Sequence, residues 1–464
     1  MKRTKRMITV LLAVSALAAV TSCSKKGGSS SEPETTTAVP TNTTEAVDTP
    51  SDNMDIVWLS DYDLNTAANG KPSAALAAFQ KQYGGTVQYV YADHNKLSTV
   101  LEAKIKAGED VDMVPYIEDF FPEGAMSSLY APLDPYFEDM GMNEAGLWDG
   151  MKDVAEQFRY NGQHYVVPYS LSDPLLITYS RKMVKEAGLD DPCELYKAGK
   201  WDWNAFTSMM DKFVEKADGT RRYGINGWFG EAALYSTGST IVKYDGAIFT
   251  SNLSDAKLDK AGALMEDVTK KQLYTKQWQD CFPTDQSTLF YAMGDWALGG
   301  SNARNPEMDL MIVPFPKAPD ADKYYMSCNF NAKMLTANSV KGKAVAKFLM
   351  CERYAVTSEK YRAAAKQQAL THLMSGNKND KHYLTEEQYD ALQSYLDPKN
   401  ITPVFDYAGG MSPKISGNGL YNYETRGVVK NLTTALLEGS SESWEELKKS
   451  VSPVLDGELQ KLNK

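Results

Sequence analysis

Cysteine and histidine are scarce in this chain, which has five cysteines and four histidines among 464 residues. Cys23 lies near the amino terminus, and the other cysteines and the histidines show neither C-x-x-C nor H-x-x-x-H spacing, so no zinc or redox site is predicted. The four later cysteines are expected to be buried free thiols. They are Cys193, Cys281, Cys328 and Cys351, and the histidines are His94, His164, His372 and His382. We assign no metal and no cofactor to them.

Positive charge and long apolar runs are also limited. The chain has 49 lysines and arginines against 60 acids, a net charge of -11, which argues against a nucleic-acid partner because phosphate binding needs concentrated positive charge. After the first segment, no stretch approaches the roughly 18 consecutive apolar residues of a membrane-spanning helix. The hydrophobic content of 43% predicts a soluble globular body with enough chain for more than one core.

The first segment reads as a secretory signal peptide. Cationic residues within 2–6 precede a mostly apolar run from Met7 to Val20, which is too short for a permanent membrane span. The run ends in Val20-Thr21-Ser22-Cys23, which resembles the lipobox of bacterial lipoproteins. This resemblance implies cleavage after residue 22 and a lipid on Cys23, which would anchor the chain to the membrane.

A tether is predicted between the lipid and the folded body. Residues 24–53 are rich in Ser, Thr, Pro, Gly and charge, with no aromatic residue, leucine or isoleucine, so they cannot bury enough apolar surface to offset the entropy of ordering. Thirty flexible residues span about 30 Å on average. Residues 23–53 therefore form a flexible anchor for an extracytoplasmic body.

The body begins with alternating strands and helices. Strands are predicted at 54–59, 86–91 and 111–114, and helices at 72–83 and 97–107. This alternation predicts an α/β fold with a parallel sheet. Ligands of such sheets bind beyond the carboxyl ends of the strands, here at 60–63, 93–95 and 116–119.

Later segments resemble, in their order, the sugar-type extracellular solute-binding proteins of ABC importers. The segments are Tyr160 to Tyr169 (Tyr-x-Gly-x-x-Tyr-x-x-Pro-Tyr), Ile177 to Lys182, Glu186 to Leu189, Trp201 to Phe206, Ala292 to Ala297, Ile312 to Pro316 and Ala344 to Met350. The resemblance as a whole covers about Ala74 to Tyr354. The chain departs from the family pattern between Met293 and Trp296, where Gly294 and Asp295 stand in place of a longer spacer.

The resemblance implies a two-lobed periplasmic-binding-protein-like fold of type II, with a ligand cleft between lobes that close by hinge motion. One lobe would comprise 54–168 and 316–355. The other would comprise 169–315 and, mainly, the C-terminal helices within 356–464, where two capping boxes are predicted at 385–388 and 443–446. In this family, the segment Ile312 to Pro316 would be the crossover back into the first lobe.

A carbohydrate site needs flat aromatic rings against the apolar sugar face, and polar side chains around its rim. By their positions in loops and at strand ends we nominate Tyr116, Tyr169, Trp228 and Trp296 as platforms, with Asp61, Glu118, Asp173 and Asn329 as polar partners. The resemblance adds support for Tyr116, Tyr169 and Trp296. Trp58, inside a strand, and Trp201 and Trp203, at the start of a helix, are expected to be structural.

These predictions favour a monomeric lipid-anchored protein on the outer face of the bacterial cytoplasmic membrane. It would capture a carbohydrate, which the resemblance implies is an oligosaccharide, and deliver it to an ABC permease without catalysis. Two alternatives stay open: a sugar-sensing or adhesion module of the same fold, and a secreted carbohydrate-active enzyme. The acid pairs Asp61/Asp63 and Glu118/Asp119 are poor catalytic dyads because side chains so close in sequence usually point in different directions. Hydrolase, zincin and P-loop motifs are absent from the sequence.

Overall fold

The computed structural model describes residues 53–66, 70–217, 219–277, 286–370, 373–374, 381–417 and 426–464. The predicted signal peptide, the lipidation site Cys23, the tether up to residue 52, Cys281 and His372 lie outside these ranges. In the described part of the chain, no helix has the length and apolar character needed to cross a membrane.

The first sheet confirms the predicted alternation of strands and helices. Its order is β15-β3-β1-β2, with β1 parallel to β2 and β3 and β15 antiparallel to β3. All five residues of β1 are buried, and α1 packs on α11 through Phe79 and Phe348, whose ring centroids are 5.4 Å apart. The elements are β1 (Ile56–Ser60), α1 (Ala74–Tyr83), β2 (Val87–Tyr91), α2 (Leu97–Ala107), β3 (Met113–Pro115), β15 (Lys333–Leu335) and α11 (Gly342–Thr357).

The second sheet has the order β12-β7-β11-β8. Strand β7 is antiparallel to both of its neighbours, and β11 is parallel to β8. Strand β12 pairs with β7 inside this sheet, so residues 310–314 belong to the second lobe, and the crossing back into the first lobe that was expected in the segment 312–316 stays a prediction at its end. The elements are β7 (Leu176–Ser180), α5 (Arg181–Glu186), α6 (Pro192–Lys197), α7 (Trp203–Glu215), β8 (Tyr223–Gly227), α8 (Phe229–Tyr235), α9 (Ala256–Lys270), β11 (Thr288–Met293), α10 (Trp296–Arg304) and β12 (Leu310–Pro314).

Each sheet has its own hydrophobic core. One cluster runs from Ile56 to Leu171 and resumes from Phe330 to Ala355. The other includes residues from Leu175 to Met326 and most of the later chain. Trp58, Trp201 and Trp203 are buried in these cores, as predicted. The described cysteines Cys193, Cys328 and Cys351 are free thiols, as predicted, and Cys193 and Cys351 are buried whereas Cys328 is partly exposed.

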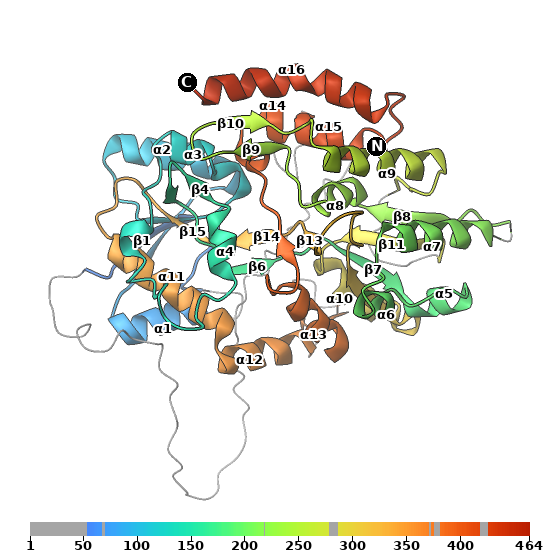
Figure 1. Cartoon of the computed structure of the whole chain (residues 1–464). Coiled ribbons are helices and arrows are strands. Elements are labelled where there is room, and N and C mark those ends of the chain that lie inside the picture. The colour runs from blue at the N-terminus through green and yellow to red at the C-terminus, as the bar shows by residue number, and fades with distance from the viewer. Residues whose placement is uncertain are drawn as a thin grey trace, which may run out of the picture.

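The chain passes between the two cores through short paired strands. Strand β6 (Ser170–Ser172) is antiparallel to β14 (Asn329–Asn331), and β13 (Tyr325–Met326) is parallel to β18 (Thr402–Pro403). Figure 1 shows β6, β13 and β14 between the two sheets. The lobe boundaries 168/169, 315/316 and 355/356 stay predictions, and the packing places Ala318 with the second core.

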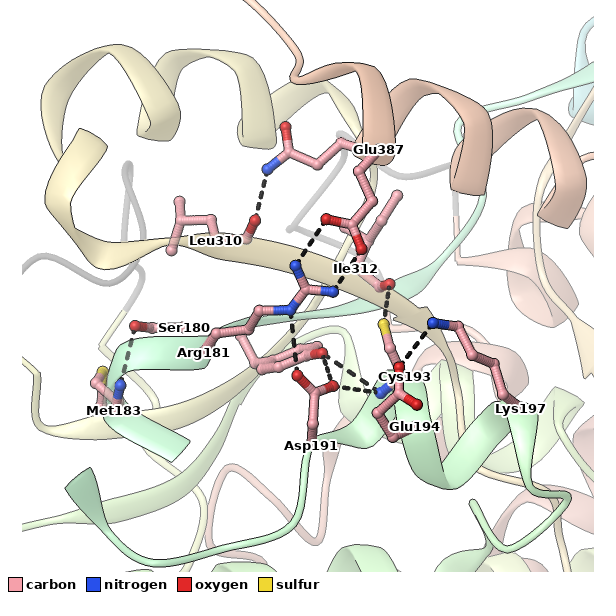
Figure 2. A network of polar contacts seen from close by, with 12 residues as sticks. Ser180, Arg181, Met183, Asp191, Cys193, Glu194, Lys197, Leu310, Ile312 and Glu387 are labelled. Carbon is pink, nitrogen blue, oxygen red and sulfur yellow. Dashed lines mark hydrogen bonds and ion pairs between the residues drawn. The ribbon is translucent and has the colours of Figure 1, made fainter. Parts of the chain in front are cut away.

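The C-terminal helices mostly pack on the second core. Both predicted capping boxes are present, Thr385 with Gln388 and Ser443 with Glu446. Helix α13 is fixed by Arg181, which donates to both carboxylate oxygens of Glu387 at 2.7 and 2.6 Å and to Asp191 at 3.1 Å (Figure 2). The helices are α12 (Glu359–Leu370), α13 (Glu386–Tyr395), α14 (Pro413–Ser416), α15 (Val428–Thr434) and α16 (Trp444–Leu462).

Short elements complete the described chain. The single turns are η1 (His94–Lys96), η2 (Glu118–Phe120), α3 (Glu123–Met126), η3 (Asp134–Tyr136), α4 (Met151–Glu156), η4 (Pro306–Met308) and η5 (Tyr407–Gly410). The strand pairs are β4 (Arg159–Tyr160) with β5 (Gln163–His164), β9 (Val242–Tyr244) with β10 (Phe249–Ser251), and β16 (Leu373–Met374) with β17 (Lys381–His382).

Candidate ligand-binding site

Asp61 follows β1, at the carboxyl end of the first sheet. His94, at the end of the neighbouring strand-to-helix connection, places Nδ1 3.2 Å from Oδ2 of Asp61. Burial alone would raise the pKa of Asp61, but the hydrogen bond and charge of His94 outweigh burial and leave the pKa below its ordinary value. Asp61 is therefore an ionised, partly exposed acceptor at neutral pH.

Tyr116 and Glu118 follow β3 at the same edge of the sheet. The partly buried ring of Tyr116 packs edge-on against Phe158, with centroids 5.6 Å apart and an interplanar angle of 89°. Glu118 is exposed, and its side chain lies against Gly409 of η5, where a Cβ would clash with the carboxylate. Glycine at this position therefore allows η5 to approach the first lobe closely.

Tyr169 has a more buried position than a stacking platform requires. Its side chain is 9% exposed, and Nζ of Lys333 lies 4.7 Å from the ring centroid and donates to the hydroxyl at 2.9 Å. Lys333 also pairs with Glu352 at 2.6 Å. The platform role of Tyr169 stays a prediction, because one face of the ring is already in contact with a cation in this structure.

Asp173 and Asn329 meet where the chain passes between the cores. Asn329 begins β14, and its Nδ2 donates to Oδ2 of Asp173 at 2.9 Å. Asp173 follows β6 and has a φ of 45°, a left-handed conformation that Asp tolerates better than most residues. The structure thus brings together these two predicted polar partners.

Trp228 and Trp296 form an exposed aromatic pair. Their side chains are 36% and 46% exposed, and their ring centroids lie 6.2 Å apart at 53°. They follow β8 and β11, which are parallel neighbours, so both lie at the carboxyl edge of the second sheet. A Cβ on Gly294 would lie 2.7 Å from Nε1 of Trp296, so the indole ring needs glycine there.

Sequence analysis did not nominate Asp295, which lies directly before Trp296. Its Oδ1 has no contact with solvent and no hydrogen-bond partner among the described residues. Burial, followed by the charge of Asp173, raises the pKa of Asp295 to about 7, while its own backbone N–H has a smaller opposing effect. The available signal in the sequence was the departure from the family pattern at Gly294-Asp295, which places a carboxyl group directly before Trp296.

The second lobe carries the aromatic pair Trp228 and Trp296 and the carboxyl group of Asp295. The crossing strands bring the carboxyl group of Asp173 and the amide of Asn329 next to this region. The first lobe carries Asp61, Tyr116 and Glu118 at its own strand ends. Aromatic rings with few polar groups are typical of small-molecule sites. Nothing in this arrangement pairs a nucleophile with a base.

Comparisons with known proteins agree with this arrangement. The family model described as bacterial extracellular solute-binding protein matches residues 74–381. A search of curated proteins finds no match.

Several solved structures share the fold, and the match to each of the following covers 88% of this chain. The sugar-binding protein MalE from Xanthomonas citri is 16% identical with a TM-score of 0.62 over 98% of its chain. The cyclic α-maltosyl-1,6-maltose binding protein from Arthrobacter globiformis is 12% identical with a TM-score of 0.61 over 100%. UgpB from Mycobacterium tuberculosis, in complex with glycerophosphocholine, is 19% identical with a TM-score of 0.58 over 99%.

Proposed function

The chain belongs to the bacterial extracellular solute-binding proteins, and on that premise we propose that it captures a carbohydrate, most simply an oligosaccharide, for an ABC importer. The exposed pair Trp228 and Trp296 carries this proposal. Two large indole faces held side by side at strand ends suit the apolar face of a sugar, and the nearby carboxyl and amide groups suit its hydroxyls.

The fold supports a hinge mechanism. Two cores joined by the short strand pairs β6/β14 and β13/β18 can rotate relative to each other with little change inside either core. A solute that contacts both lobes binds the closed form better and shifts the population towards it. Trp228 and Trp296 would then form one wall, with Asp61, Tyr116 and Glu118 opposite and Asp173 and Asn329 at the hinge. Tyr169 would line the floor.

The placement of the protein in the cell belongs to the same proposal. Lipid on Cys23 and the tether that follows would hold the body at the outer face of the cytoplasmic membrane. There a monomer would pass its solute to the permease subunits. The family's extracellular character supports this location.

The proposal is tested by a thermal-shift screen of the protein against monosaccharides, disaccharides, linear oligosaccharides, amino acids, polyamines and peptides, followed by calorimetric titration of the hits. A ligand at a hundredfold excess over its Kd stabilises the folded state by about 2.7 kcal/mol. We expect a response to one sugar class without turnover. Silence towards every sugar with a response to peptides would contradict the carbohydrate assignment.

Trp296→Ala provides the site-level test. Loss of one stacking face should weaken the sugar about tenfold, since such contacts contribute about 1.5 kcal/mol. Val454→Ala on α16 is the matched control, because Val454 is an apolar side chain of similar exposure, 43%, away from the strand ends. Equal affinity in wild type and Trp296→Ala would remove Trp296 from the site.

A further inference from the structure

The carboxyl group of Asp295 has an acceptor oxygen that the described protein leaves unused. Oδ1 is buried and accepts no hydrogen bond from the described residues. Asp295 also stands at the N-cap of the nine-residue helix α10, but its side chain makes no capping hydrogen bond to that helix. A buried acceptor without a donor is costly to keep, so its position beside the candidate site suggests that a ligand supplies the donor.

The immediate charged neighbour of Asp295 increases this cost. Asp173 acts on Asp295 as a like charge, and among the described residues no cation is found to shift the titration of Asp295. The neutral side-chain amide of Asn329 donates a hydrogen bond to Oδ2 of Asp173 at 2.9 Å. The two carboxyl groups therefore lie close enough to repel each other, without a described cation that balances their charge.

The same region offers aromatic faces that attract cations. Trp296 is the next residue along the chain, and Trp228 lies 6.2 Å from it between ring centroids. The negative face of an indole ring binds a cation more strongly than other aromatic side chains do. Carboxylates and tryptophan faces together are the chemistry that recognises an ammonium group.

We infer that Asp295 and Asp173, with Trp228 and Trp296, form a subsite for a positively charged amino group of the solute. The inference rests on the proposed function for the rest of the ligand, which is then an amino-substituted sugar. The ammonium group donates to Oδ1 of Asp295 and lies near the indole faces. Sugars with carboxylate or phosphate groups at this position are rejected by the two acids.

The raised pKa of Asp295, about 7, agrees with a missing counter-charge. Without a ligand, burial and Asp173 hold part of the Asp295 population in the neutral form. A bound ammonium group supplies an opposite charge and a charge-assisted hydrogen bond, both of which favour the ionised form.

The test uses two probes of the same size that differ in charge, methylammonium chloride and methanol, at constant ionic strength. The complete mature chain, held in a mild detergent, is labelled with 15N in its tryptophan side chains. Trp228→Phe and Trp296→Phe assign the two indole N–H resonances. We expect saturable shifts of both resonances with methylammonium and none with methanol.

Three variants locate the response. Asp295→Asn and Asp173→Asn should each weaken methylammonium binding about tenfold, while Asp456→Asn, an exposed acid on α16, should leave it unchanged. Shifts that are equal with methanol, absent with methylammonium, or unchanged in Asp295→Asn would each overturn the inference.

The outcome stays separable from that of the sugar screen. Methylammonium binding here in a protein that ignores all sugars keeps the subsite and removes the carbohydrate function. Sugar binding without a methylammonium response keeps the function and removes the subsite. Where a sugar binds, its amino-substituted form should bind about tenfold more tightly than the hydroxyl form, and equal binding would count against the inference.

Discussion

Replacing Asp295 with Asn should stabilise the protein, and increasingly so as the pH rises. In the folded protein, burial and Asp173 raise the pKa of Asp295 from 3.8 to about 7, whereas the unfolded chain keeps the ordinary value. Between these values the folded state holds a proton that the unfolded state has released, so wild-type stability falls as the pH rises.

The magnitude follows from the pKa difference. One pKa unit corresponds to about 1.36 kcal/mol, so a rise from 3.8 to about 7 lowers the unfolding free energy of wild type by up to about 4 kcal/mol above pH 7. Asn has no proton to lose. The variant should therefore match wild type near pH 4 to within its neutral packing difference, and exceed it by up to about 4 kcal/mol at pH 8.

Urea unfolding of both proteins at pH 5, 6, 7 and 8, followed by circular dichroism, measures this gap. Asp456→Asn on α16 controls for the loss of one negative charge from an acidic protein. A gap between Asp295→Asn and wild type that stays constant from pH 5 to pH 8 would refute the reasoning, as would a gap that shrinks.

Three further perturbations test other parts of the structure. Lys333→Met should lower the free energy of unfolding by about 3–5 kcal/mol, because it leaves the largely buried Glu352 without its partner. In thermal unfolding, the double variant that also carries Glu352→Gln should recover part of this loss. Equal stability of Lys333→Met and wild type would contradict the pairing. Asp406→Asn should lower the free energy of unfolding by about 2 kcal/mol or more. The two carboxylate oxygens of Asp406 accept from the backbone N–H of Ile241, at 2.6 Å, and of Val242 and Ala408, and an amide has only one oxygen that can accept. Unchanged hydrogen exchange at Ile241 would argue against this. Cys23→Ala should release the protein from the membrane fraction, and unaltered attachment would dismiss the lipid anchor.

Most of the first sheet could be predicted from the sequence, because the signals for its strands and helices lie within the segments that form them. The apolar run at β1, the helical spacing in α1 and α2 and the glycines after those helices require no knowledge of distant residues. The place of β15 in that sheet could not be read in this way, since residues 333–335 pair with 113–115 across the whole second lobe. The segment Ile312 to Pro316 likewise gives no local signal of where the chain leaves the second lobe, because most of it is an apolar strand of the second sheet.

The sequence predicted which residues lie near the candidate site, but not what surrounds each of them in the folded protein. Strand ends identified Trp228 and Trp296, whose exposure and proximity the structure then gives. Tyr169 also lies near a strand end in the sequence, but Lys333, from a strand far along the chain, contacts its ring. Asp295 was passed over because its distinguishing property is the absence of a described partner, which depends on how Asp173 and β11 are brought together.

The interleaved connection of the two cores has a consequence for export. Neither core is a continuous piece of chain: the first sheet lacks β15 until residues 333–335 have been made, and the second core lacks α16 until residues 444–462 have been made. Such distant pairings form slowly because the entropy of closing a long loop is lost before the contacts that compensate for it are made. The amino-terminal part of either lobe is therefore left with unpaired strand edges and uncovered apolar surface until a segment hundreds of residues later has been made, which favours transport of the chain before it folds.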